Sequence, residues 1–122
     1  MSYKIAVASS DGKVVNQHFG RATQFLIFEI ESGNFKFLEL IDSNPFCNHG
    51  EHDDNKLSNA VDALKNCRAV LVSQIGNGAA QAIRSKGIDV FDIHTFIDDA
   101  LRKLINYYDK NETKRAIHSK DV

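Results

Sequence analysis

The residues best suited to chemistry crowd into one short stretch of the chain, from Asn44 to Asp54. Its potential metal ligands are one cysteine, two histidines and three carboxylates: Cys47, His49, Glu51, His52, Asp53 and Asp54. Thiolate and imidazole are the usual protein ligands of zinc, iron and copper. The spacing Cys-x-His-x-x-His lacks the paired second half of a structural zinc module. The stretch is therefore a candidate metal-binding loop, and the alternative is a solvated surface loop that is rich in histidine.

A second candidate lies nearer the N-terminus, in His18-Phe19-Gly20-Arg21. The imidazole of His18 is a potential metal ligand, although a single loop histidine more often has no such role. The guanidinium of Arg21 suits an anionic ligand, but pairing with a surface carboxylate is the default for an exposed arginine. Both residues are therefore candidates for ligand binding, provided that other potential ligands lie beside them in the fold.

A third candidate is the segment Ile75-Gly76-Asn77-Gly78, between an apolar run and a helical pattern. Glycines let backbone N–H groups approach a ligand, and a helix N-terminus favours anions. A tight turn from strand to helix would require glycine as well. The segment has neither the Lys-Ser/Thr of a P-loop nor the third glycine of a dinucleotide fingerprint, which argues against a nucleotide.

The apolar pattern predicts five strands and three helices to position these segments. Strands are expected over residues 4–9, 25–31, 35–41, 69–72 and 88–93. Helices are expected over residues 55–67, 77–86 and 95–108, with Thr95-x-x-Asp98 close to a capping box. Ser32-Gly33-Asn34 predicts a hairpin turn, and residues 42–54 predict a long loop. The apolar stripe of the last helix, which runs from Phe96 to Tyr108, should pack Ile97, Leu101 and Leu104 onto the first strand.

This order of elements predicts where the candidate segments meet. Three hairpin-linked strands followed by two helix–strand units form a mixed sheet with helices on both faces. The first and fourth strands are the most uniformly apolar, so they should be central, adjacent and parallel. The loops after the first, third, fourth and fifth strands then share one edge, where open α/β sheets bind ligands. That edge should hold His18, residues 44–54, residues 75–78 and His94.

Composition limits the class of protein. The 122 residues suit one domain, and the 15 basic and 16 acidic residues lack the basic excess typical of nucleic-acid binding. No apolar run approaches the ~20 residues of a membrane span, and the N-terminus is typical of a strand rather than a signal peptide. We expect a cytoplasmic domain over residues 1–108 and a polar, frayed tail over residues 109–122.

The two cysteines, Cys47 and Cys67, are expected to be free thiols. Cys67 precedes the fourth strand, which places it at the opposite end of the sheet from Cys47. A strand of this length separates its two ends by roughly 20 Å, whereas a disulfide needs Cα atoms within ~7 Å. Cys67 is therefore predicted to be a small buried residue that forms no bridge.

Several segments, in this order, resemble the dinitrogenase iron–molybdenum cofactor biosynthesis family. That family includes small cofactor carriers and the C-terminal domain of the nitrogenase cofactor B protein. The resemblance covers residues 3–108 and rests on Lys4-Ile5-Ala6-Val7-Ala8-Ser9, Asp11-Gly12, Val15-x-x-His18-Phe19-Gly20-Arg21-Ala22, Phe25-Leu26-Ile27-Phe28, Cys67-Arg68-Ala69-Val70-Leu71-Val72, Ile75-Gly76 and Gly87-Ile88.

The resemblance implies a fold and a function. The fold is a three-layer, ribonuclease-H-like α/β/α domain with a five-stranded mixed sheet in the order 3-2-1-4-5. The function is non-covalent binding of an iron–sulfur or iron–molybdenum cluster precursor, which passes between metallocluster assembly proteins or to apo-nitrogenase components in nitrogen fixation. His18 occupies the family's His-Phe-Gly position and is carried over as a candidate ligand. The loop that contains Cys47 matches no family pattern, so its role rests on ligand chemistry.

The first interpretation is therefore a non-enzymatic cluster carrier that acts as a monomer or weak dimer, with no nucleic-acid or membrane partner. Its expected cofactor-binding residues are His18, Arg21, Gly76 and Gly78, and its expected metal ligands are His18, Cys47, His49 and His52. The alternative is a mononuclear metal-binding or metal-sensing domain unrelated to nitrogenase. A hydrolase ranks third, because two-metal hydrolysis needs converging carboxylates and the first strand offers none before Asp11.

Overall fold

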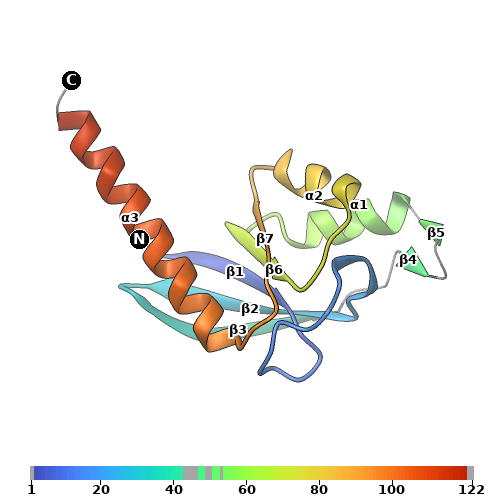
Figure 1. Cartoon of the computed structure of the whole chain (residues 1–122). Helices are drawn as coiled ribbons and strands as arrows, with labels where there is room; N and C mark the ends of the chain where they lie inside the picture. The colour runs from blue at the N-terminus through green and yellow to red at the C-terminus, as the bar shows by residue number, and fades with distance from the viewer. Residues whose placement is uncertain (1, 43–46, 49–50, 53, 121–122) are drawn as a thin grey trace.

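A five-stranded mixed sheet organises the chain in the computed structural model (Figure 1). The structure describes residues 2–42, 47–48, 51–52 and 54–120, and it describes side chains for residues 2–42 and 57–110. The strands are β1 (Tyr3–Ala8), β2 (Gln24–Glu31), β3 (Asn34–Asp42), β6 (Ala69–Val72) and β7 (Asp89–Asp92), arranged in the order β3-β2-β1-β6-β7. β1 runs antiparallel to β2 and parallel to β6, which runs parallel to β7. The predicted order and the central position of the first strand are confirmed.

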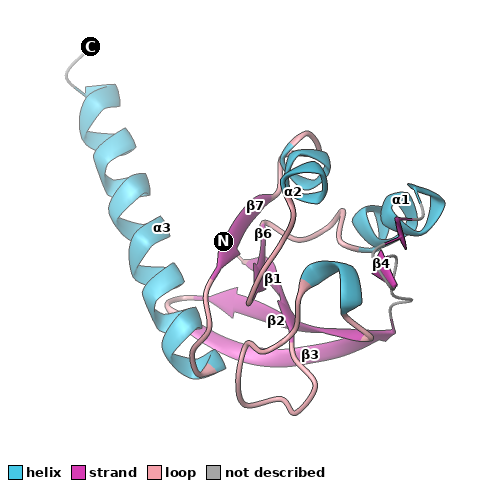
Figure 2. Ribbon diagram, turned by 45° about the vertical axis from the view of Figure 1, so that its right-hand side comes forward, coloured by secondary structure: helices cyan, strands magenta, loops and turns pink. Residues whose placement is uncertain are grey.

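Helices cover both faces of this sheet (Figure 2). α1 (Asp54–Ala63) and α2 (Asn77–Arg84) lie on one face, and α3 (Ile97–Lys120) lies on the other. Successive side chains of β1 point to opposite faces, so Ala6 and Ala8 enter the core beneath α1 and α2, whereas Ile5 and Val7 enter the core beneath α3. The second core includes the three predicted α3 residues, Ile97, Leu101 and Leu104. The three-layer arrangement is confirmed, and its classification as ribonuclease-H-like stays a prediction.

The predicted turn between β2 and β3 is also confirmed. Glu31 pairs with Asn34, which leaves Ser32 and Gly33 as a two-residue connection with φ values of 53° and 78°. Two successive positive φ angles match the backbone twist of the flanking strands. This tight turn aligns the long β2–β3 hairpin.

The stretch predicted as one long loop contains more structure than expected. β4 (Cys47–Asn48) pairs antiparallel with β5 (Glu51–His52), and α1 begins at Asp54. Strands of two residues are too short to show an alternating pattern, so sequence periodicity could not reveal them. Residues 43–46, 49–50 and 53, which include His49, lie outside the described residues.

The last helix begins differently from the prediction. α3 starts at Ile97, whose backbone N–H donates to the carbonyl of Lys13 at 2.8 Å. The carbonyl of Thr95 accepts from the N–H of Val15 at 2.9 Å, so this segment is bound to the first loop. Phe96, expected within the apolar stripe, is 62% exposed. Backbone hydrogen bonds with a distant loop hold the start of this helix.

The C-terminal segment is helical where a frayed tail was expected. α3 continues beyond residue 108 and ends at Lys120. Once a helix is nucleated by packing, each added residue gains one backbone hydrogen bond without a further nucleation cost. The polar composition of residues 109–120 therefore did not end the helix, although it removed the apolar pattern by which the helix was predicted. The domain boundary at residue 108 stays a prediction.

Candidate functional site

The loop that carries His18 is bound by its backbone to the loop that follows β6. His18 forms an isolated parallel β-bridge with Gln74. The N–H of Phe19 donates to the carbonyl of Gln74 at 2.9 Å, and the N–H of Ser73 donates to the carbonyl of Gln17 at 3.0 Å. These two bonds flank His18, whose side chain is exposed. The imidazole is therefore presented to solvent from a backbone held on both sides.

The side chain of Phe19 anchors the same loop in the core. Phe19 begins η1 (Phe19–Arg21), a single 3-10 turn, and its ring is fully buried 5.6 Å from the ring of Phe25. The N–H of Arg21 donates to the carbonyl of His18 at 3.1 Å and closes the turn. The pattern His-Phe-Gly-Arg thus places an apolar anchor between two exposed cationic or metal-binding side chains, His18 and Arg21.

The short β4–β5 hairpin lies against η1. Its register makes Cys47 the Cα partner of His52, and Asn48 the Cα partner of Glu51. The candidate Cys47–His52 segment and the His18 loop are therefore adjacent at the level of the backbone. The structure does not describe the side chains of Cys47 and His52, and His49 lies outside the described residues.

The glycines at the start of α2 complete this edge. Gly76 is the N-cap residue of α2, with ordinary extended angles of φ −75° and ψ 156°, and Gly78 lies in the first turn. A Cβ atom added to Gly76 or Gly78 would meet no atom within 4 Å. The turn therefore does not require either glycine, which removes the purely structural explanation for them. Both lie exposed at a helix N-terminus whose first turn contains no acidic residue.

Side-chain hydrogen bonds that the sequence pattern did not predict stabilise the loop after β1 before it reaches His18. The buried hydroxyl of Ser9 accepts hydrogen bonds from the N–H groups of Asp11 and Gly12, at 3.3 and 3.0 Å. The carboxylate of Asp11 accepts from the N–H groups of Lys13 and Val14, at 2.9 and 3.1 Å. These backbone donors, Lys13 first, lower the pKa of the Asp11 carboxyl. The cluster Ser9-Ser10-Asp11-Gly12 carried the signal, because Ser and Asp side chains bond neighbouring backbone groups in turns.

The remaining candidates lie apart from this arrangement. His94 is exposed after β7, and Cys67 is a buried free thiol before β6, as predicted. Burial raises the pKa of Cys67 to about 11. Among the described residues, no three His, Cys, Asp or Glu side chains gather as a metal site. In that same part of the chain, no helix has both the length and the apolar character of a membrane span.

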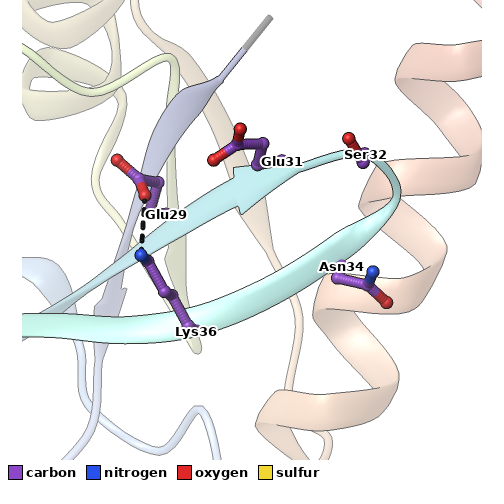
Figure 3. Close-up of a pocket in the computed structure, with 5 residues that line it drawn as sticks. All are labelled: Glu29, Glu31, Ser32, Asn34 and Lys36. Atoms are coloured by element: carbon purple, nitrogen blue, oxygen red, sulfur yellow. Dashed lines mark ion pairs between the residues drawn. The ribbon is translucent and has the colours of Figure 1, made fainter.

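A shallow cavity of about 270 Å³ lies at the other end of the sheet (Figure 3). It is lined by Glu29, Glu31, Ser32, Asn34 and Lys36 of the β2–β3 hairpin. The ammonium of Lys36 lies 3.4 Å from the carboxylate of Glu29. Since this hairpin turn is beside the start of β1 and His18 follows the end of β1, the cavity is remote from the candidate site.

Similar proteins identify the family of this domain. The sequence profile described as dinitrogenase iron-molybdenum cofactor matches residues 1–107. The FeMo cofactor biosynthesis protein NifB of Frankia alni is 36% identical over 103 residues, which cover 82% of this chain and 20% of that protein. The protein MJ0580 of Methanocaldococcus jannaschii is 33% identical over 94 residues, which cover 77% of this chain and 78% of that protein.

Solved structures share the fold of this chain. The apo form of the orange protein from Desulfovibrio gigas superposes with a TM-score of 0.65 at 22% identity, over 85% of this chain and 88% of that one. The protein PH0822 superposes with a TM-score of 0.64 at 29% identity, over 84% and 88% of the two chains. The present chain spans only about a fifth of the length of the NifB relatives. The profile match nevertheless extends over nearly the whole domain, and the chain belongs to the dinitrogenase iron-molybdenum cofactor family.

Proposed function

We propose that this domain is a non-enzymatic carrier of an iron–sulfur or iron–molybdenum cluster precursor in nitrogenase cofactor biosynthesis. One observation carries the proposal beyond family membership. The His18 loop is hydrogen-bonded to the loop after β6, and the β4–β5 hairpin lies against η1. Three segments with candidate ligands therefore meet at one edge of the sheet, at the carboxyl ends of β1 and β6, where α/β folds bind ligands.

The exposed groups at this edge suit an anionic cluster. The imidazole of His18 supplies a nitrogen ligand, and the guanidinium of Arg21, three residues further along, supplies positive charge. The unobstructed surfaces of Gly76 and Gly78 leave the first turn of α2 open to a large ligand. Backbone N–H groups at such a helix N-terminus add favourable electrostatics for negative charge.

A carrier must also release its cargo, and this site suits release. Only two cysteines exist in the chain, and Cys67 is buried, so the domain cannot supply the four thiolates of a tight cluster site. A cluster held by His18 and a few further ligands would exchange readily with a protein that offers more thiolates. The partners of this transfer are metallocluster assembly proteins or apo-nitrogenase components, and the compartment is the cytoplasm.

Mononuclear metal binding is the second candidate function, and the β4–β5 register favours it. The pairing of Cys47 with His52 brings two borderline-to-soft ligand types to opposed backbone positions. Directly opposed residues of an antiparallel pair have Cα atoms about 4.5 to 5.5 Å apart, which is a suitable spacing for ligands of one ion. Such a site would extend toward His18, because β4 lies against η1.

Metal and sulfide analysis of anaerobically purified protein separates the two functions. A carrier should contain iron together with acid-labile sulfide, or acquire both when reconstituted with ferrous iron and sulfide. A mononuclear site should instead take up one equivalent of zinc, iron or nickel with no sulfide. Failure to retain iron and sulfide after reconstitution would contradict the carrier proposal.

The contribution of the hairpin needs a separate experiment. The triple variant Cys47→Ser, His49→Ala, His52→Ala removes its candidate ligands while leaving His18 in place. We expect this variant to lose a mononuclear metal entirely, and to bind iron and sulfide more weakly if the hairpin contributes to a cluster site. Unchanged binding of both would show that the hairpin supplies no ligand.

A further inference from the structure

The two edges of the sheet differ in length and in exposed apolar residues. The β7 edge is four residues long and begins and ends with an exposed aspartate, Asp89 and Asp92. The β3 edge is nine residues long, and among the described strands only β2 pairs with it. Its apolar residues Phe37, Leu38 and Leu40 are 54%, 40% and 49% exposed. Long apolar edges invite pairing with another strand, and proteins normally shorten or charge them.

A β-bulge in β3 arranges the residues of this edge. Phe37 pairs with Phe28 and Glu39 pairs with Ile27, so Leu38 is the extra residue. Paired residues share a face of the sheet. Lys36 lies opposite Glu29, and Glu39 lies opposite Ile27, so both residues lie on the face covered by α1 and α2. In a regular strand, residues three apart would lie on opposite faces, and the bulge brings these two to the same face.

We propose that β3 pairs antiparallel with β3 of a second copy of this chain, about a two-fold axis between Phe37 and Leu38. This register places Lys36 of each copy opposite Glu39 of the other. Because both residues lie on one face, the two opposite charges meet twice across the axis. The central apolar residues Phe37 and Leu38 then face one another across the same axis. The product is a continuous ten-stranded sheet.

Charge also favours a second copy over an unrelated partner. The strand is self-complementary in charge, because two-fold symmetry pairs Lys36 of each copy with Glu39 of the other. The net charge of the chain is only −1, so two copies repel each other weakly. Lys36 lies 3.4 Å from Glu29 on β2 (Figure 3). The second copy would add a further carboxylate beside Lys36. The His18 loop lies outside this interface, because its backbone pairs with Gln74 after β6, and β2 and β1 separate β6 from β3 in the sheet.

Sedimentation at increasing protein concentration tests the dimer, and a charge exchange tests its register. Lys36→Glu places two like-charged carboxylate pairs in the homodimer, and Glu39→Lys places two ammonium pairs there. Each variant should associate about tenfold more weakly than the wild type, or worse. An equimolar mixture of the two variants restores both attractive pairs and should associate at least as strongly as the wild type. A wild-type chain that stays monomeric, or a mixture that does not recover, would overturn the proposal.

A second pair of variants guards against a folding artefact. Leu38→Lys introduces a charge at the centre of the proposed axis, whereas Phe96→Lys introduces the same charge at an exposed apolar residue outside β3, just before α3. Leu38→Lys should abolish association, and Phe96→Lys should leave it unchanged, with both variants retaining the wild-type circular dichroism spectrum. Equal association in Leu38→Lys and the wild type would contradict the proposal.

Discussion

Polar side chains have different environments at the two ends of the central strands. At the amino ends of β1, β6 and β7, the side chains of Arg68, Tyr108 and Asp89 contact one another. The guanidinium of Arg68 lies 3.7 Å from the ring centre of Tyr108 and 4.8 Å from that of Tyr3. The hydroxyl of Tyr108 donates to Asp89 at 2.6 Å. At the carboxyl ends, the backbone is held by hydrogen bonds while the side chains of His18 and Arg21 remain exposed.

This difference separates a stabilising end from the proposed binding end. The cluster of Arg68, Tyr108 and Asp89 at the amino end contributes cation–π and hydrogen-bond energy to the fold. At the carboxyl end, backbone hydrogen bonds and the buried ring of Phe19 fix the loop, which leaves the candidate side chains His18 and Arg21 exposed. Substitutions at the two ends should therefore affect stability and ligand binding separately.

The largest expected effect comes from the anchor beneath the binding end. Phe19→Ala removes a fully buried ring and should lower the free energy of unfolding by about 3 to 5 kcal/mol. It should also release His18 from its fixed position, so any ligand binding should weaken. Urea unfolding followed by circular dichroism measures the first effect. A loss below about 0.5 kcal/mol would mean that Phe19 does not anchor the loop.

The next effect belongs to the stabilising end. Tyr108→Phe keeps the ring against Arg68 but removes the hydroxyl that donates to Asp89, which should cost about 1 to 3 kcal/mol. Iron and sulfide binding should not change. Urea unfolding and reconstitution of the same sample test both statements, and a variant that loses binding would contradict the separation of the two ends.

Tyr108 should also make stability depend on alkaline pH. Burial, and then the hydrogen bond to Asp89, raise the pKa of the Tyr108 hydroxyl above its usual value. A raised folded-state pKa gives stability that is complete below the unfolded pKa of about 10 and is lost as the pH rises above it. The unfolding free energy of the wild type should therefore fall more steeply above pH 10 than that of Tyr108→Phe. Parallel profiles for the two proteins would contradict this assignment.

A smaller effect, opposite in sign, is expected at the start of α2. Gly78 has an ordinary helical environment with space for a Cβ atom, so Gly78→Ala should raise stability by about 0.5 to 1 kcal/mol. If a cluster approaches this turn closely, the added methyl group should weaken its binding. Thermal unfolding and iron–sulfide titration of the same variant measure the two effects, and unchanged binding would remove Gly78 from the site.

The smallest effect concerns Cys67, which should be chemically inert in the folded protein. Its burial and raised pKa leave little thiolate near neutral pH. In a Cys47→Ser variant, where Cys67 is the sole thiol, a disulfide reagent at pH 8 should react only after urea unfolds the chain. Rapid reaction of the folded variant would show that the reagent reaches Cys67 in the folded protein, and would contradict its burial.

Topology was predictable from the sequence because it depends on patterns that extend over many residues. The uninterrupted apolar run of β6 predicted a central strand, and Ser32-Gly33 predicted the turn that the positive φ angles confirm. The order of elements then required the loops after β1 and β6 to share one edge, and the His18–Gln74 bridge lies there. Long-range patterns determine which segments meet.

Local details that depend on distant contacts were not predictable. The start of α3 is held by the carbonyl of Lys13, which lies far from Ile97 in the sequence. The two-residue strands β4 and β5 carry no periodic signal. That Gly76 and Gly78 are dispensable for the turn is evident only from the space around them. The order of elements therefore predicted which segments form the candidate site, but not the hydrogen bonds and the exposure of each residue within it.

Binding of iron and sulfide by His18→Ala tests the central claim most directly. His18 is exposed, so its removal should change the unfolding free energy by no more than about 0.5 kcal/mol. His94→Ala, at an exposed histidine after β7, is the matched control. Anaerobic titration with ferrous iron and sulfide, followed by absorbance, should show weakened binding in His18→Ala and wild-type binding in His94→Ala. Wild-type binding in His18→Ala would contradict the assignment of this edge as the cluster site.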